Sequence, residues 1–239
     1  MGLEALHNGF WLGVLDKPLL DAACEQYYDE RPAYQSSDYN RKGLSDWERE
    51  MVDRFFPPAG RLLVTAAGGG REVLALHKRG YQLDAVECNP RLVASANRFL
   101  ESEQVPCVVR LVAPDSAPAG AQQYGAIVVG WGSYMLIQGR ARRIAFLRAL
   151  RGRLKDGAPL LLSFFTRDED TPYFRLMRAV ANGLRTVLRR EPIDLGDSLT
   201  PSYAHYFRRE ELAAELQAAG LELLYFGDTD YGHAVGRAI

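Results

Sequence analysis

The residues best suited to chemistry are a run of glycines and a carboxylate, each placed after an apolar stretch. Gly68, Gly69 and Gly70 follow the apolar residues 62–65 and precede a stretch of helical character. Glycine lets the backbone take a positive φ or lie directly against a ligand, and a helix N-terminus offers free N–H groups. Glu87 ends the next apolar stretch, where a carboxylate can accept hydrogen bonds from a ribose diol. This combination predicts a nucleoside-binding site.

The spacing of the glycines separates this loop from other nucleotide-binding loops. It lacks the G-x-G-x-x-G of dinucleotide sites and the G-K-[ST] of a phosphate-binding loop. A glycine triplet by itself is as often only a tight turn between a strand and a helix. The prediction therefore depends on the order of strand, glycine turn, helix, strand and acid within one βαβ unit.

The elements that must position these residues alternate along the chain. Strand-like apolar runs occupy 62–65, 82–87, 108–112, 126–129 and 160–165. Helical patterns fall between or after them, at 71–79, 90–101 and 140–154. The end of the chain, 208–239, has the pattern helix, strand, turn, strand. We expect an α/β fold: a doubly wound, mostly parallel seven-stranded sheet with an antiparallel strand near its edge.

Two segments outside this alternation are predicted to cover the core. Residues 1–59 are helical and rich in tyrosine, and Pro57-Pro58 ends them. Residues 166–207 contain a polar loop, an amphipathic helix at 173–190 and a second loop. We therefore expect one domain over 1–239, with an N-terminal helical cap, a core at 60–165, a lid or acceptor insert at 166–207 and closing elements at 208–239.

Composition excludes several classes of protein. The net charge of −1 gives no field that favours nucleic acid. The cysteines lack the spacing of a disulfide frame, and neither they nor the histidines have the spacing of a metal site. No apolar run has the length of a transmembrane helix, and the start of the chain has no basic segment typical of a signal peptide. We expect a cytoplasmic protein without a metal.

Three segments of the chain resemble one family. The run LLVTAAGGGREVLALHKRGYQLDAVECNP resembles the first two signature segments of class I S-adenosylmethionine-dependent methyltransferases. The segments YGAIVVGWGSYMLI and LRGRLKDGAPLLLSFF resemble the family's fourth- and fifth-strand segments. The resemblance covers 60–165 closely and 208–239 in outline. It implies a Rossmann-like fold, S-adenosylmethionine as the cofactor, and transfer of its methyl group to a small-molecule acceptor.

The resemblance also implies which residues bind the cofactor. Ala66, Gly68 and Gly70 occupy the positions of the family's G-x-G-x-G, and Ala66 departs from it by one methyl group. Glu87 matches the ribose-binding acid, and Asp115 matches an acid that bonds the adenine amino group, although Asp115 also suits a plain turn. The other cofactor-binding residues implied are Ala67, Gly69, Cys88, Asn89, Gly130 and Trp131.

Methyl transfer leaves the protein mainly the task of positioning the reactants, because the cofactor carries the activated group. Tyr39, with Tyr34, lies in a polar stretch that could close over the cofactor and attract its sulfonium. His205 is the candidate general base, because imidazole titrates near neutral pH. Tyr134, shortly after Trp131, is expected near the methyl group. For Tyr39, His205 and Tyr134, the alternative to a functional role is that the side chain only packs within the fold.

Other functions remain open from the sequence. An RNA or protein methyltransferase would need a basic groove or an acidic peptide cleft, and the net charge gives little support to the former. A protein that binds S-adenosylmethionine without catalysis would fit the departure at Ala66. The apolar stripe of the 173–190 helix predicts packing on the domain, while its arginines leave a membrane surface or a homodimer contact open.

Overall fold

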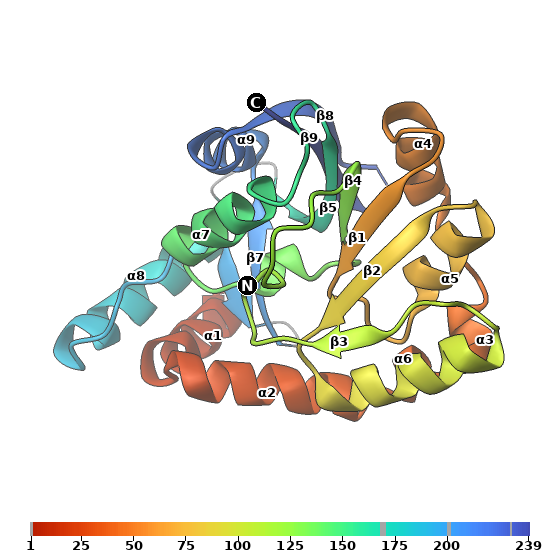
Figure 1. Ribbon diagram of the computed structural model, residues 1–239. Helices are drawn as coiled ribbons and strands as arrows, with labels where there is room; N and C mark the ends of the chain where they lie inside the picture. The colour runs from red at the N-terminus through yellow and green to blue at the C-terminus, as the bar shows by residue number, and fades with distance from the viewer. Residues whose placement is uncertain (1, 168–170, 200–201, 230) are drawn as a thin grey trace.

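The computed structural model describes residues 2–167, 171–199, 202–229 and 231–239, and a sheet forms its centre (Figure 1). Within this part of the chain the sheet has nine strands, seven of which follow the order β3-β2-β1-β4-β5-β7-β6, with β9 beside β5 and β8 beside β9. The strands are β1 (Arg61–Thr65), β2 (Gln82–Glu87), β3 (Val109–Leu111), β4 (Ala126–Val129), β5 (Pro159–Thr166), β6 (Asp197–Leu199), β7 (Tyr203–Phe207), β8 (Leu221–Gly227) and β9 (Gly232–Ala238).

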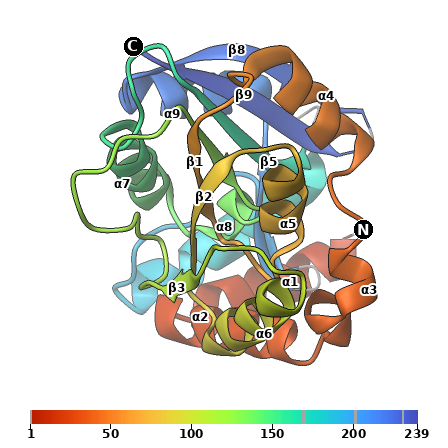
Figure 2. The ribbon, with the colours of Figure 1, turned by 45° about the vertical axis from the view of Figure 1, so that its right-hand side comes forward.

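Helices cover both faces of this sheet, and one group lies beyond the carboxyl ends of its parallel strands (Figures 1 and 2). The helices are α1 (Gly2–Val14), α2 (Lys17–Asp29), α3 (Ser37–Asn40), α4 (Asp46–Phe55), α5 (Arg71–Lys78), α6 (Pro90–Ser102), α7 (Arg140–Arg151), α8 (Pro172–Val187) and α9 (Arg209–Ala218), with 3₁₀ turns η1 (Pro32–Gln35) and η2 (Tyr134–Leu136). None of the helices in the described ranges combines the length and apolar character needed to cross a membrane.

The residues of β1 alternate between two apolar cores. Leu62 and Val64 pack with residues of α4, α5 and α6, whereas Leu63 packs with residues of α7 and α9 on the opposite face. Successive side chains of a strand point to opposite faces, so a strand that is apolar at consecutive positions needs cover on both. The apolar runs of the sequence therefore produce the doubly wound layers, with α7 and α9 on one side of the sheet in Figure 2 and α4 and α5 on the other.

The predicted α/β architecture is confirmed: β1, β2, β3, β4 and β5 are parallel, and β9 pairs antiparallel with β5. The predicted number of seven strands is wrong for the described residues. The second loop predicted in the insert contains β6 and β7, which form an antiparallel hairpin. Strand β7 joins the sheet only at the last two residues of β5, Phe165 and Thr166. Residues 168–170 and 200–201 of this insert lie outside the described residues.

Helices α1 and α8 come from the two predicted covering segments and pack closely together. A Cβ at Gly9 would lie 2.7 Å from the Met177 carbonyl oxygen, and one at Gly13 would lie 2.8 Å from the Leu184 side chain. Arg185 donates to the carbonyls of Leu12 and Leu15 at the C-terminus of α1, where a cation is favoured by the helix dipole. The apolar stripe of α8 therefore packs against α1.

Candidate functional site

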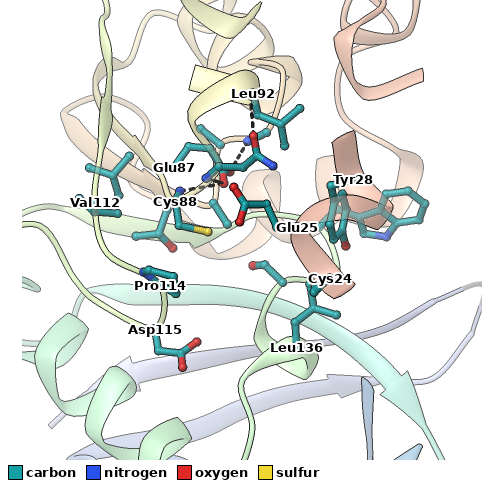
Figure 3. A pocket seen from close by; sticks show the side chains of 18 of the residues that line it. Cys24, Glu25, Tyr28, Glu87, Cys88, Leu92, Val112, Pro114, Asp115 and Leu136 are labelled. Carbon is teal, nitrogen blue, oxygen red and sulfur yellow. Dashed lines mark hydrogen bonds between the residues drawn. The ribbon is translucent and has the colours of Figure 1, made fainter. Parts of the chain in front are cut away.

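A cavity of about 240 Å³ opens where the parallel strands end and α2 crosses them, far more than the roughly 30 Å³ of one water molecule. Its wall comes from the loops that follow β1, β2, β3 and β4, from α2 and from residues 34–40. Figure 3 shows the contributions of α2 and of the segments that follow β2 and β3. In parallel α/β sheets ligands bind at this edge, beyond the carboxyl ends of the strands. The cavity is therefore the candidate active site.

The glycine loop forms the floor of this cavity. Gly68 and Gly70 have φ values of 52° and 96°, and Ala66 has a φ of 51°. A left-handed conformation costs an L-residue on the order of 1–2 kcal/mol, so Ala66 fills its position with some strain. Gly69 has no room for a side chain, because a Cβ there would lie 2.0 Å from the Tyr34 carbonyl oxygen. The loop and residues 34–40 thus lie directly against each other.

The carboxylate of Glu87 holds this loop to the end of β2. Its Oε2 accepts a hydrogen bond from the Gly68 backbone N–H at 2.9 Å. Its Oε1 accepts two more, from Cys88 N at 2.8 Å and Asn89 N at 2.9 Å. Glu87 lines the cavity and is only 5% exposed. The same carboxylate therefore shapes the glycine loop and lines the cavity.

Tyrosines from residues 28–39 form another part of the cavity wall. Tyr28, Tyr34 and Tyr39 all line the cavity, and their rings follow one another at centroid distances of 5.3 and 5.8 Å. The Asn40 amide donates to the Tyr34 carbonyl at 3.3 Å, which fixes the turn that carries these rings. Tyr34, Tyr39 and Asn40 thus contribute to the cavity wall, and their role as a lid stays a prediction.

The cavity carries an excess of negative charge. Among its described lining residues, one side chain is a guanidinium, Arg71, and five are carboxylates: Asp21, Glu25, Glu72, Glu87 and Asp115. Lys17 compensates two of them at the rim, with its Nζ 2.7 Å from Asp21 and 3.1 Å from Asp115. Such a site favours a ligand with positive charge and disfavours a pyrophosphate. The charge therefore fits a sulfonium cofactor better than a dinucleotide.

Two buried polar atoms of the cavity residues lack a partner in the described structure. They are the side-chain oxygens Oδ1 of Asn40 and Oγ1 of Thr65, and both residues line the cavity. Buried polar atoms are nearly always hydrogen-bonded, so an unsatisfied pair beside a cavity calls for a ligand with donors. Together with the glycine floor and the carboxylates, they fit the polar amino-acid end and the ribose of S-adenosylmethionine.

The structure gathers most of the residues predicted to bind the cofactor around this cavity. Gly70 and Gly130 do not line it; Gly70 begins α5, and Gly130 packs so closely that a Cβ would lie 2.0 Å from the Ala66 carbonyl oxygen. The carboxylate of Asp115 is bound to Lys17, which competes with its predicted contact to adenine. The predicted residues that do line the cavity are Tyr39, Ala66, Ala67, Gly68, Gly69, Glu87, Cys88, Asn89, Asp115 and Trp131.

The two residues predicted to be catalytic lie behind the cavity wall. Tyr134 is 0% exposed, and its hydroxyl donates to Glu215 at 2.6 Å. His205 is 2% exposed and pairs through Nδ1 with Asp197 at 2.7 Å. Tyr203 separates His205 from the cavity: it lines the cavity and donates to the same Asp197 oxygen at 2.8 Å. A catalytic role for His205 would therefore have to pass through Tyr203.

We expect the His205→Ala variant to lose stability but to keep its activity per folded molecule. Burial is the largest single influence on Asp197 and would raise its pKa. The hydrogen bonds from His205 and Tyr203 and the charges of His205 and Arg143 together outweigh it, so the pKa lies below its usual value. The pair therefore stabilises the fold at neutral pH, and the variant should lose about 1–2 kcal/mol in urea unfolding. A large drop in turnover with a changed pH profile would instead support His205 as the general base.

Asp194, Asp197 and His205 also lie close enough to be considered as metal ligands. Their oxygens are already engaged, because Asp197 accepts from Tyr203, His205 and the Asp194 backbone. Asp194 in turn accepts from the backbone of Arg140 and from the guanidinium of Arg143. The cluster is thus a hydrogen-bonded network in which the Arg143 guanidinium already supplies the positive charge that a metal ion would bring.

Sequence reasoning missed the contribution of α2. Asp21, Cys24, Glu25 and Tyr28 all line the cavity, and their spacing of three and four residues places them on one face of the helix. This spacing was a usable signal, since it combines acids and a tyrosine on one face. Glu72, next to the glycine loop, was also missed although it lines the cavity.

Comparisons with sequences give no relative for this chain. No protein-family model matches it, and a search of curated proteins returns no match.

Solved structures, in contrast, match it over most of its length. A SAM-dependent methyltransferase from Methanosarcina mazei aligns with a TM-score of 0.65 and 17% identity, covering 82% of this chain and 99% of its own. CalS10, an amino pentose methyltransferase from Micromonospora echinaspora with SAM bound, aligns with a TM-score of 0.56 and 16% identity, covering 94% and 98%. The glycopeptide N-methyltransferase MtfA in complex with SAM gives 0.59 and 17%, covering 80% and 92%.

These similarities show that the chain has the fold of SAM-dependent methyltransferases. The identities of 16–17% support the fold alone. What the protein binds and does must be argued from its own cavity.

Proposed function

We propose that the protein is an S-adenosylmethionine-dependent methyltransferase that acts on a small-molecule acceptor. The observation that carries this proposal is the acid-rich cavity over the glycine loop, in a chain with a methyltransferase fold. Its charge suits a sulfonium compound, and its unsatisfied polar atoms suit the amino-acid end of that compound. Bound there, the cofactor would supply the activated methyl group.

Different residues of the cavity wall would contact different parts of the cofactor. Glu87 would accept from the ribose hydroxyls, and the backbone of the glycine loop would lie against the ribose and the methionyl part. Cys88 and the residues that follow β3 would border the adenine. Trp131, after β4, would border the methyl group, where the acceptor must approach. Burial raises the pKa of the Cys88 thiol, as does the neighbouring Glu87, so this thiol stays protonated.

The exposed Trp131 belongs to a group of aromatic residues whose other members are half-buried. We call this group the aromatic vestibule and define it as Trp131, Phe165, Tyr206 and Tyr231. The Tyr231 ring lies 5.1 Å from Trp131 and 5.5 Å from Phe165, and Phe165 lies 5.0 Å from Tyr206. These residues come from the ends of β4, β5, β7 and the start of β9. The rings are tilted against one another and partly exposed, and such rings suit the flat faces of an aromatic compound or a sugar.

The vestibule predicts the effect of a substitution at Tyr231. We expect Tyr231→Leu to leave the affinity for S-adenosylhomocysteine unchanged, because this residue does not line the cavity. Loss of a stacking face should raise the acceptor KM by roughly tenfold. The measurement is release of S-adenosylhomocysteine from S-adenosylmethionine with a panel of phenols, aryl amines and amino sugars, repeated with the variant on each accepted compound.

Two results would count against the proposal. Turnover with RNA or with a protein substrate, and with none of the small molecules, would assign the enzyme to another substrate class. Binding of S-adenosylhomocysteine without turnover on any acceptor would favour a non-catalytic binding protein. The glycopeptide and amino pentose named for the matched structures are substrates of those proteins, and they guide the choice of amino sugars for the panel.

A further inference from the structure

Three charged side chains are buried together where α4 meets the start of α5. The Arg71 guanidinium lies 2.6 and 2.7 Å from the two oxygens of Glu48 and 2.6 Å from Oε1 of Glu72. The side chains of Arg71, Glu48 and Glu72 are 9%, 3% and 6% exposed. Two carboxylates thus share one guanidinium, and with both ionised the group carries a net negative charge with little exposure to solvent.

Only one carboxylate of this group faces the cavity. Glu72 lines it, whereas Glu48 lies outside the described cavity wall and caps α4 through its bonds to Ser45. The backbone N–H of Trp131 approaches Glu72 Oε1 at 3.4 Å, which places the carboxylate at the end of β4. Burial raises the pKa of Glu72 against the opposing effect of Arg71. An excess buried charge is costly unless a partner compensates it.

A cation with several N–H donors would compensate this charge and would also supply donors to neutral oxygens of the same cavity. The unsatisfied oxygens of Asn40 and Thr65 belong to the same wall as Glu72. A carboxylate and two neutral oxygens provide three acceptors, and a primary ammonium has three donors. The sulfonium of the cofactor has positive charge but no N–H, so it cannot satisfy these atoms.

We propose that Glu72, together with the side-chain oxygens of Asn40 and Thr65, binds the α-ammonium group of S-adenosylmethionine. This inference rests on the proposed function, because it assigns one part of the same cofactor. It makes the Glu48–Arg71–Glu72 group a recognition element for the amino acid end. Arg71 and Glu48 act by holding the Glu72 carboxylate in place.

A competing arrangement makes the opposite prediction. Arg71 also lines the cavity, and an arginine is a usual partner for a carboxylate. If Arg71 bound the carboxylate of the cofactor, Glu72 would repel that group, and its neutralisation would tighten binding. The direction of the change in affinity therefore decides between the two.

The first test uses the unaltered protein and three ligands in isothermal titration. They are S-adenosylhomocysteine, its analogue with hydrogen in place of the α-ammonium, and 5′-methylthioadenosine, which lacks the amino acid end. We expect the deaminated analogue to bind roughly 10-fold to 100-fold more weakly than S-adenosylhomocysteine. Equal affinity of the two would overturn the proposal, even if no variant could be purified.

The second test uses Glu72→Gln, with Asp53→Asn as a control that removes an ion-paired carboxylate outside the cavity. Glu72→Gln should lose most of the discrimination between S-adenosylhomocysteine and the deaminated analogue, because the ammonium loses its charged acceptor. Its affinity for 5′-methylthioadenosine should be unchanged. The control should keep the discrimination of the unaltered protein. Discrimination retained in Glu72→Gln, or tighter binding of S-adenosylhomocysteine to it, would overturn the proposal.

A failure of the cofactor assignment itself gives a different result. The unaltered protein would then bind none of the three ligands. This result would refute both the proposed function and the ammonium site. Binding of 5′-methylthioadenosine and S-adenosylhomocysteine with equal affinity would preserve the nucleoside site and refute the ammonium site alone.

Discussion

The Glu87→Ala variant is expected to bind S-adenosylhomocysteine about 100-fold more weakly than the unaltered protein. This corresponds to roughly 2.7 kcal/mol of binding free energy. The effect should exceed that of a single ribose contact, because the carboxylate also accepts from the backbone N–H groups of Gly68, Cys88 and Asn89. Without it, three donors lose a charged acceptor and the glycine loop loses its tie to β2.

Asp84→Ala is the matched control for this prediction. Asp84 lies on the same strand, but its carboxylate is bound to Arg61 and to the Tyr124 hydroxyl, away from the cavity. The control should bind S-adenosylhomocysteine normally in isothermal titration. An unchanged dissociation constant in Glu87→Ala would contradict the role of this carboxylate in the site.

The largest effect on stability is expected for Arg143→Leu. Arg143 is 1% exposed, and its guanidinium bonds Glu215 at 2.8 and 3.1 Å and Asp194 at 3.2 Å. Glu215 is itself buried and also accepts from the Tyr134 hydroxyl. Removal of the arginine leaves this carboxylate as an uncompensated buried charge, which costs about 3–5 kcal/mol in the free energy of unfolding.

Arg142→Leu provides the comparison on the same helix. Its guanidinium pairs with Glu191 at the surface, where the two side chains are 39% and 73% exposed, and such pairs contribute about 0–1 kcal/mol. A double variant, Arg143→Leu with Glu215→Leu, should recover much of the loss because the Glu215 carboxylate is no longer left without its partner. Urea unfolding measures all three. An equal cost for Arg143→Leu and Arg142→Leu would contradict the buried network.

The core of the fold could be predicted because its signals are local. The strands β1, β2 and β4 are apolar at nearly every position, and Gly80 and Asn89 mark the ends of the helices between them. Strands β6 and β7 could not be predicted in the same way. Their sequence mixes polar and aromatic residues, and β7 is paired to the sheet only through two residues of β5, a contact distant in sequence.

The candidate site likewise has a part that could be predicted from the sequence and a part that could not. The glycine loop and Glu87 lie on consecutive elements, so their spacing placed them together. The acids and tyrosine of α2 reach the cavity only because the N-terminal helices cross the ends of the strands. The negative charge of the cavity could not be predicted for the same reason. The net charge of the chain is only −1, because basic residues elsewhere in the chain balance the acids that line the cavity.

The buried partners of His205 and Tyr134 also required the tertiary structure. Asp197 is eight residues from His205, across a hairpin. Glu215 lies on α9, far along the chain from Tyr134. A histidine or tyrosine beside a predicted site has no sequence signal that separates a reacting group from one that is satisfied in the core.

Isothermal titration of the purified protein with S-adenosylhomocysteine, with NAD⁺ as the comparison ligand, tests the central claim most directly. The glycine loop and Glu87 predict binding of S-adenosylhomocysteine, and the excess of carboxylates predicts no binding of NAD⁺, whose pyrophosphate they would repel. Binding of NAD⁺ alone, or of neither compound, would contradict the assignment of the cavity as the cofactor site of a methyltransferase.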